Sequence, residues 1–222
     1  MKPFDGYVDK YLKARPNKKR PKGMLYVTDL TKSCQRNAYY SIVTPGTEYP
    51  KNTLRIFESG NMVEAWWTEV LDKDPTIDII GTQVKCYYID READIEIHGR
   101  LDILCQHNNT KLVAHEVKSI KTTHYLKGKP KDSHYQQLQF YLNSLGLDFG
   151  WVDYLAKDIM LGGGKVDDNV DTCFLVERDF NVFSEMIQRA KRLNGYLGPH
   201  DAPAEKGWLC DYCQFKELCE NE

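Results

Sequence analysis

The chain has 222 residues, of which 41% are hydrophobic and 28% are charged, and its formal net charge is −2 at pH 7. These values fit an ordinary globular protein with one large domain, or one domain and a small appendage. No apolar run approaches the roughly 18 residues of a membrane-spanning helix, and the near-neutral charge gives no global sign of nucleic-acid binding.

The N-terminal stretch MKPFDGYVDKYLK lacks the apolar centre of a signal peptide, so we expect a cytosolic protein. Seven cysteines in a cytosolic chain do not indicate a disulfide framework, and we expect metal ligands among them.

The first third of the chain reads as helical. Residues 1–23 predict one short helix and a basic arm, and 28–43 predict a helix that contains Cys34. Residues 54–71 carry apolar side chains at helical spacing, with Gly60 inside the pattern.

The pattern then becomes strand-like. β-Branched runs predict strands over 77–89, 95–106, 111–120, 150–158 and 170–178. Helices are expected over 133–146, which ends at a glycine, and over 181–198. This order predicts an α/β fold with a mixed central sheet flanked by helices. We expect three parts of one compact unit: 1–53, a core at 54–180, and a cysteine-bearing end at 181–222.

Acidic residues converge in the predicted sheet. Glu116 and Lys118 share one face of strand 111–120, because side chains alternate with period two. The four-residue turn before that strand makes it an antiparallel neighbour of 95–106, so Asp102 can meet Glu116, and Glu64 on the preceding helix can join them. Such carboxylates suit Mg²⁺ or Mn²⁺, with the lysine beside an attacking water. From spacing alone, a solvated sheet face with surface ion pairs explains them equally well.

The spacing of Asp102, Glu116-x-Lys118 and Gln137-x-x-x-Tyr141 resembles the RecB-like branch of the PD-(D/E)XK nucleases. The resemblance implies a restriction-endonuclease-like core. It implies metal ligands at Glu64, Asp102, Glu116 and the carbonyl of Val117, with Lys118 activating water and Gln137 and Tyr141 placing the DNA. RecB-like members carry a histidine where GNMVE (60–64) has Glu64, which leaves the role of Glu64 open.

The end of the chain reads Cys210-x2-Cys213-x5-Cys219, and Cys34 is a candidate fourth ligand. By spacing alone, this set fits tetrahedral zinc as well as an iron–sulfur cluster. The order of all the motifs resembles iron–sulfur nucleases, among them the CRISPR-associated Cas-four family and AddB-type nuclease domains. That resemblance implies a [4Fe–4S] cluster, with [2Fe–2S] and zinc as alternatives. The remaining cysteines, Cys86, Cys105 and Cys173, are expected in the core.

The Cas-four resemblance implies an exonuclease that degrades single-stranded DNA from 5′ to 3′, with endonuclease activity as a further possibility, in CRISPR spacer acquisition or DNA processing. It implies CRISPR integrase proteins as partners, and oligomers are possible. Basic runs at 13–22 and 119–131 are candidate phosphate contacts, and Tyr125, Tyr135 and Tyr141 are candidate stacking partners for bases. The alternatives are a module that binds DNA or a partner without cutting, and a zinc-stabilised phage or repair nuclease.

Overall fold

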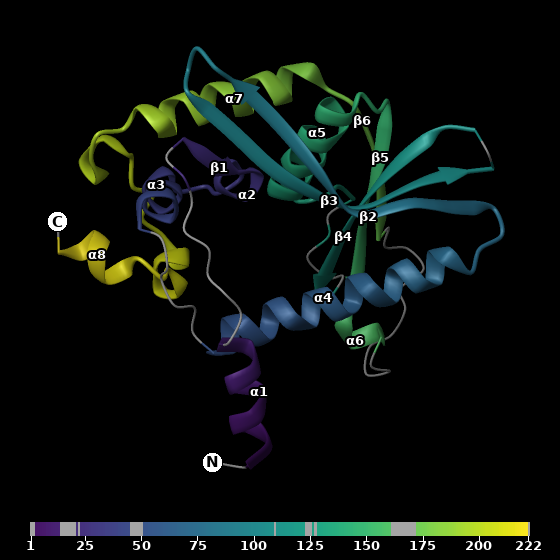
Figure 1. Cartoon of the computed structure of the whole chain (residues 1–222). Helices are drawn as coiled ribbons and strands as arrows, with labels where there is room; N and C mark the ends of the chain where they lie inside the picture. The colour runs from purple at the N-terminus through teal and green to yellow at the C-terminus, as the bar shows by residue number, and fades with distance from the viewer. Residues whose placement is uncertain are drawn as a thin grey trace.

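A computed structural model of the chain describes residues 3–13, 21, 23–44, 51–108, 110–122, 126, 128–160 and 172–221 (Figure 1). Of the expected basic runs, residues 14–20, 22, 123–125 and 127 therefore lie outside the described part, as does Tyr125.

The helices and strands follow the predicted order. The strands are β1 (Met24–Tyr26), β2 (Ile77–Asp90), β3 (Ile95–His107), β4 (Leu112–Ile120), β5 (Phe149–Ala156) and β6 (Cys173–Glu177). The α-helices are α1 (Pro3–Lys13), α2 (Val27–Leu30), α3 (Gln35–Val43), α4 (Lys51–Asp72), α5 (Asp132–Leu145), α6 (Lys157–Met160), α7 (Phe180–Gly195) and α8 (Lys216–Glu220). The short 3₁₀ turns η2 (Pro199–Asp201) and η3 (Trp208–Tyr212) separate α7 from α8.

The predicted α/β fold with a mixed sheet is confirmed. Six strands form one sheet in the order β1-β3-β4-β5-β6, and β2 pairs with the other edge of β3. β1 with β3 and β4 with β5 are parallel pairs, whereas the remaining pairs are antiparallel. The three-residue strand β1 was not predicted, because it is too short to show alternation in sequence and exists by pairing with Glu96–His98.

Helices cover both faces of the sheet (Figure 1). The larger core lies between the sheet and the helices α5 and α7, where Leu138, Phe140 and Ala190 are fully buried. On the opposite face α4 packs through Leu71 onto Ile103 and Val117. The site residues carried by β3 and β4 are thus held between two packed layers, which fixes their positions.

The expected helix over 28–43 was wrong in one respect, because it is two helices. Cys34 stands between α2 and α3 in extended backbone (φ −78°, ψ 116°), and its Sγ accepts the Asn37 N–H at 3.5 Å. Cys34 is therefore the N-cap residue of α3, and its thiol lies at the N-terminal end of that helix rather than inside a helix.

Candidate active site

The sheet forks at the centre of β3. On one edge, β3 pairs with β1 over Glu96–His98 and with β4 over Ile103–Gln106, so residues 99–102 have no strand partner on that edge. Figure 1 shows β4 diverging from the long β2–β3 pair at this place. Asp102 lies at the fork, and its Oδ2 accepts the Val117 N–H at 2.8 Å. The Asp102 carboxylate therefore accepts the backbone N–H of Val117, which the β3–β4 ladder leaves without a strand partner. This hydrogen bond orients the Asp102 side chain toward β4.

Glu116 and Lys118 form the ion pair that the alternation predicted, with Lys118 Nζ bonded to Glu116 Oε1. The Glu116 side chain is fully buried, and its Oε2 has no hydrogen-bond partner among the described residues. An unpaired buried carboxylate oxygen costs free energy unless a cation or donor reaches it. The solvated sheet face considered above is thereby excluded for Glu116.

Glu64 joins the site through a residue that the sequence analysis missed. Gln83 on β2 donates its side-chain amide to Glu64 Oε1 and, at 3.4 Å, to Asp102 Oδ1. Its backbone is left-handed (φ 50°), which is uncommon for a residue with a side chain and is found preferentially at functional sites. In the sequence, the signal for Gln83 was its position as a polar residue within the strand-like run IDIIGTQVKC.

The three carboxylates do not form a complete set of metal ligands in this conformation. Among the described residues, no choice of one oxygen each from Glu64, Asp102 and Glu116 places all three atoms within 4.8 Å of one another. The Gln83 amide stands between Glu64 and Asp102. A cation that took its place would draw the carboxylates inward.

Burial and mutual repulsion set the charges of this group. Burial, followed by the Asp102 carboxylate, raises the pKa of Glu116 to about 8, although Lys118 opposes the shift. Burial likewise raises the pKa values of Asp102 and of Glu64. Burial alone would lower the pKa of Lys118, but Glu116 and Asp102 outweigh it and raise the value. Lys118 is the cation that acts on all three carboxyl groups, and Arg100 adds to its effect only on Glu64. A divalent cation would supply further positive charge.

Helix α5 brings the expected glutamine and tyrosine to the same place. Gln137 Nε2 donates to Tyr141 Oη at 2.9 Å, as their i, i+4 spacing predicted. Tyr141 is buried, so base stacking by this ring was a wrong expectation. A Cβ on Gly99 would lie 2.5 Å from the Tyr141 ring, so the glycine of GRLD allows α5 to approach β3.

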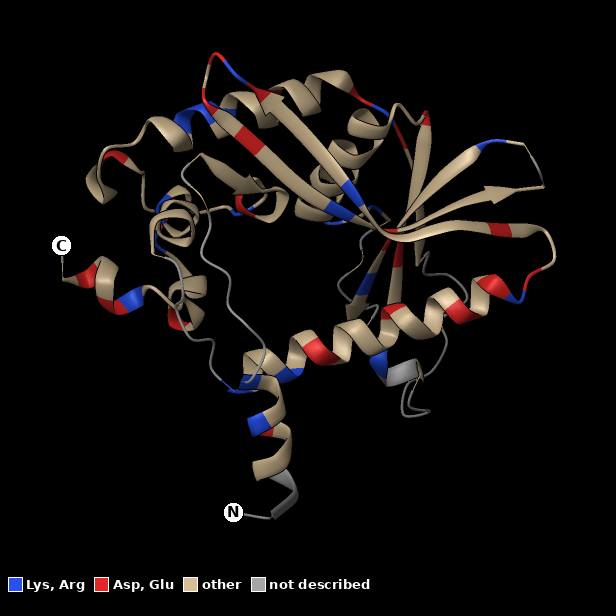
Figure 2. Cartoon of the chain, viewed as in Figure 1, with Lys and Arg blue, Asp and Glu red and all other residues tan. Residues whose placement is uncertain are grey.

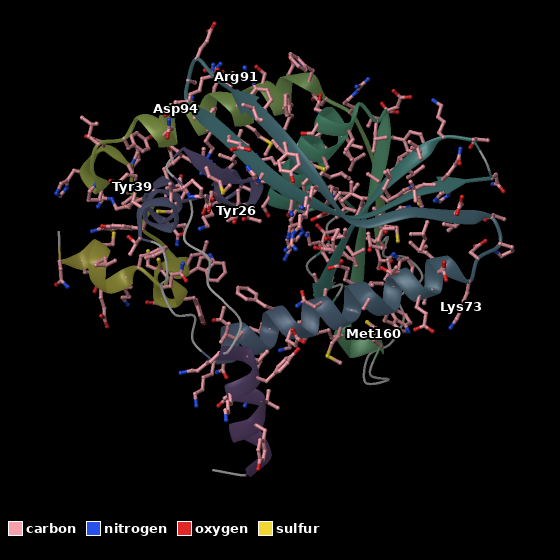
Figure 3. All side chains as sticks on the ribbon, viewed as in Figure 1. Tyr26, Tyr39, Lys73, Arg91, Asp94 and Met160 are labelled. Carbon is pink, nitrogen blue, oxygen red and sulfur yellow. The ribbon has the colours of Figure 1, made fainter. Side chains whose placement is uncertain are left out.

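Three of the four cysteines expected at a metal centre are linked through residues at the start of α3, which contacts the C-terminal segment. Asn37 links two of them, because its backbone N–H faces Cys34 Sγ and its side-chain amide donates to Cys213 Sγ at 3.2 Å. Arg36 donates to Cys219 Sγ at 3.9 Å and to the Ala202 carbonyl at 3.1 Å. Figure 3 shows Tyr39 in this region, and its ring packs with those of Tyr40 and Tyr196.

The prediction that the three remaining cysteines lie in the core is correct for two of them. Cys86 and Cys105 are buried in strands, but Cys173 is exposed on β6, because that strand presents its odd-numbered residues to the surface.

Comparison with known proteins decides the family. The model of the PD-(D/E)XK nuclease superfamily matches residues 9–220. The chain belongs to the PD-(D/E)XK nuclease superfamily. Nucleases of this superfamily use divalent metals, and the RecB-like resemblance seen in the motifs agrees with this assignment.

Individual relatives agree with the superfamily. The CRISPR-associated exonuclease Cas4 of Saccharolobus solfataricus is 26% identical over 124 residues, which are 56% of this chain and 52% of that protein. The match thus spans about half the length of this relative. Among solved structures, SSO0001 shares the fold with a TM-score of 0.69 at 19% identity, over 97% of this chain and 96% of the other. LHK-Exo in complex with dAMP matches with a TM-score of 0.56 at 14% identity, over 90% and 96%.

Two further observations concern the helices and the charge distribution of this PD-(D/E)XK protein. None of the helices in the described ranges has the length and apolarity that a bilayer crossing requires. Figure 2 shows acidic and basic residues mixed along α4 and the sheet, so in this view the charge is not gathered on one basic face.

Proposed function

We propose that this protein is a Mg²⁺- or Mn²⁺-dependent deoxyribonuclease that hydrolyses phosphodiester bonds. The observation that carries the proposal is the Asp102 carboxylate held on the Val117 N–H beside the buried Glu116–Lys118 pair. The resemblance to the superfamily motif supports this assignment, as does Glu116 Oε2, a buried oxygen that has no hydrogen-bond partner in the part of the chain that the structure describes.

The residues fit a divalent cation. Asp102, Glu116 and the carbonyl of Val117 would hold it, with Glu64 as a further oxygen ligand once Gln83 has moved aside. Carboxylate and carbonyl oxygens are the ligands that these hard ions prefer. The ion supplies a lower pKa for bound water and stabilisation of the charge that develops on the phosphate.

The chain's own groups orient the reaction. Lys118 stays charged between Glu116 and Asp102, so its ammonium orients the attacking water and contacts the phosphoryl oxygens. Gln137 on α5 is bonded to Tyr141, on which the charges of Glu116 and Asp102 act, and we assign its amide to a contact with the DNA strand. Tyr141 does not contact DNA in this scheme, because it is buried. It positions Gln137 through their hydrogen bond.

A route for the DNA backbone begins directly after the Lys118 strand. A cavity of about 320 Å³ is lined by Ser119, Ile120, Lys121, Thr122, Leu126 and Lys131. Two lysines on the wall of a cavity next to the site favour a bound phosphate, and such binding weakens as salt rises.

We infer an iron–sulfur cluster rather than zinc at Cys34, Cys210, Cys213 and Cys219. Four cysteine thiolates fit a tetrahedral zinc ion as well as an iron–sulfur cluster. The choice of the cluster rests on the resemblance of the motif order to the iron–sulfur nucleases and on the similarity to a CRISPR-associated exonuclease. Held by these thiolates, the cluster would join α3 to the C-terminal end as a structural element.

The finer activity rests on the relatives. We propose a single-stranded DNA exonuclease with 5′ to 3′ polarity that prepares DNA for CRISPR spacer acquisition, with integrase proteins as partners. The similarity to a CRISPR-associated exonuclease, over half of that relative, supports the exonuclease activity and the CRISPR setting. The strand preference, the polarity and the integrase partners rest on the Cas-four resemblance of the motifs.

One observation favours a second candidate, a module that binds DNA without cutting. Glu64 stands where RecB-like relatives have a histidine, and Gln83 occupies the space between Glu64 and Asp102. Metal that cannot displace this amide would leave the site inactive.

Cleavage assays with Lys118→Ala separate the two candidates. Single-stranded DNA labelled at its 5′ or 3′ end is incubated with Mn²⁺ and with wild type, Lys118→Ala, or the control Lys85→Ala. We expect the Lys118 variant to lose at least about 100-fold in rate and the control to cut normally. Early release of the 5′ label would support the polarity. Equal cutting by both variants would exclude the assigned role of Lys118, and no cutting by wild type would favour the binding module.

A further inference from the structure

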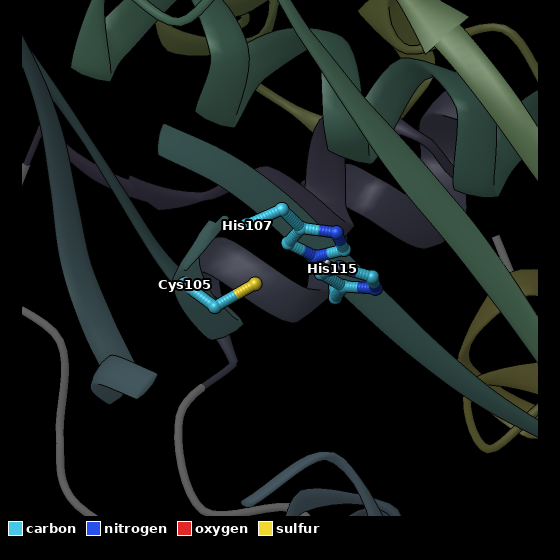
Figure 4. A group of neighbouring side chains, drawn as sticks. All are labelled: Cys105, His107 and His115. Carbon is cyan, nitrogen blue, oxygen red and sulfur yellow. Dashed lines mark hydrogen bonds between the residues drawn. The ribbon is translucent and has the colours of Figure 1, made fainter. Parts of the chain in front are cut away.

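A second group of metal-binding side chains lies on the face of the sheet that Glu116 does not use. Cys105 and His107 on β3 and His115 on β4 each offer a ligand atom, and the three atoms lie within 4.8 Å of one another (Figure 4). The register Ile103↔His115 and Cys105↔Val113 places all three on one face. His115 directly precedes Glu116, so the group lies across β4 from the nuclease site.

The two imidazoles are already at the spacing of a bound ion. His107 Nε2 and His115 Nε2 are 3.4 Å apart, and the rings are stacked with an interplanar angle of 13°. A tetrahedral zinc ion with Zn–N bonds of about 2.0–2.1 Å holds two nitrogens about 3.3–3.4 Å apart. Figure 4 shows the Cys105 thiol pointing toward the same rings.

A buried carboxylate orients His115. Asp153 on β5 accepts from His115 Nδ1 at 2.7 Å and from Trp67 Nε1 on α4 at 3.2 Å. Because Nδ1 donates to Asp153, the other ring nitrogen, Nε2, is the one turned toward His107. A histidine that ligates a metal through one nitrogen commonly donates the other N–H to a carboxylate in this manner. Asp153 and His115 are both buried, so their orientations are fixed by packing.

We propose that Cys105, His107 and His115 bind one divalent ion of the zinc class, with Asp153 orienting His115 and solvent at the fourth position. One thiolate and two imidazoles suit zinc, cobalt or nickel, whereas Mg²⁺ and Mn²⁺ prefer the oxygens of the nuclease site. The ion joins β3 to β4 beside their turn. It thereby stabilises the register that places Asp102 opposite Glu116. The proposal does not depend on nuclease activity.

Cobalt and zinc titrations of the full-length protein test it. Wild type, His107→Ala and Cys105→Ser are stripped with a chelator, and Co²⁺ and then Zn²⁺ are added at equilibrium. His98→Ala on the same strand and Cys173→Ser are the matched controls. Because the tail thiols also bind these ions, the same variants are compared in a Cys210→Ser background.

We expect wild type and both controls to bind one more ion per chain than His107→Ala, in either background. The extra ion should add thiolate-to-cobalt charge-transfer absorbance to that of the tail thiols, and Cys105→Ser should lack this added absorbance. In the Cys210→Ser background, zinc at about 100 times its dissociation constant for this site should raise the melting temperature by about 5–10 °C more in the otherwise wild-type protein than in His107→Ala.

Equal stoichiometry and equal thermal shifts in wild type and His107→Ala would overturn the proposal. If Cys105→Ser keeps the full added absorbance of wild type, the thiol is not a ligand and the proposal is overturned as stated. His107 is only half-buried at the end of β3, so its removal leaves the fold intact and decides the question even where the Cys105 variant does not fold.

Discussion

The buried carboxyl of Glu116 predicts an unusual dependence of stability on pH. Its folded pKa of about 8 lies above its ordinary value of 4.5, so the native state binds more protons than the unfolded state between these two values. The free energy of unfolding of the metal-free protein should therefore fall as pH rises through this window. Each pKa unit corresponds to about 1.4 kcal/mol, so roughly 3 kcal/mol should be lost between pH 5 and pH 8.

The substitution Glu116→Gln isolates this contribution. Urea unfolding of wild type and variant is followed by tryptophan fluorescence in EDTA at several pH values. The loss of the contact with Lys118 changes the free energy of unfolding of the variant by an amount that depends little on pH between pH 5 and pH 8. Only wild type has a Glu116 proton to lose in this range. The stability of wild type relative to the variant should fall by roughly 3 kcal/mol from pH 5 to pH 8.

Two further conditions sharpen the test. Mn²⁺ should reverse the fall in wild type, because the cation binds the ionised carboxylates, and should leave Glu116→Gln almost unchanged. The exposed control Glu69→Gln should show no comparable pH-dependent difference from wild type. A difference between wild type and Glu116→Gln that stays flat across this range would refute the assignment of Glu116 as a buried, crowded carboxyl.

The remaining predictions concern three other places in the fold. Gly99→Ala should destabilise the protein by about 1–3 kcal/mol in urea unfolding, because the new methyl group would overlap the ring that α5 packs there, whereas Gly198→Ala, with open space, should be neutral. A neutral Gly99→Ala would contradict this packing. Cys213→Ser should lose the visible absorbance of the anaerobically purified protein and Cys173→Ser should keep it; an unchanged spectrum in the former would remove the cluster assignment. Gln83→Ala should lower the stability of the metal-free protein by about 1–3 kcal/mol and recover it with Mn²⁺, and a loss that metal does not restore would argue against a place-holding amide.

Local patterns in the sequence predicted which residues meet at the candidate nuclease site. Period two in VAHEVKS placed Glu116 and Lys118 together, and a short turn placed Asp102 on the neighbouring strand. The i, i+4 spacing placed Gln137 beside Tyr141. These are local regularities of strands and helices, so they could be read without knowing the fold.

The contacts around those residues could not be predicted without the fold. The fork in β3 gave Asp102 its bond to Val117, and the left-handed backbone at Gln83 brought an amide between two carboxylates. Tyr141, expected to contact DNA, is buried and bonded to Gln137. The group of Cys105, His107 and His115 needed the register of two strands and a carboxylate from a third. Each of these depends on contacts between segments far apart in the chain, and local spacing carries no record of them.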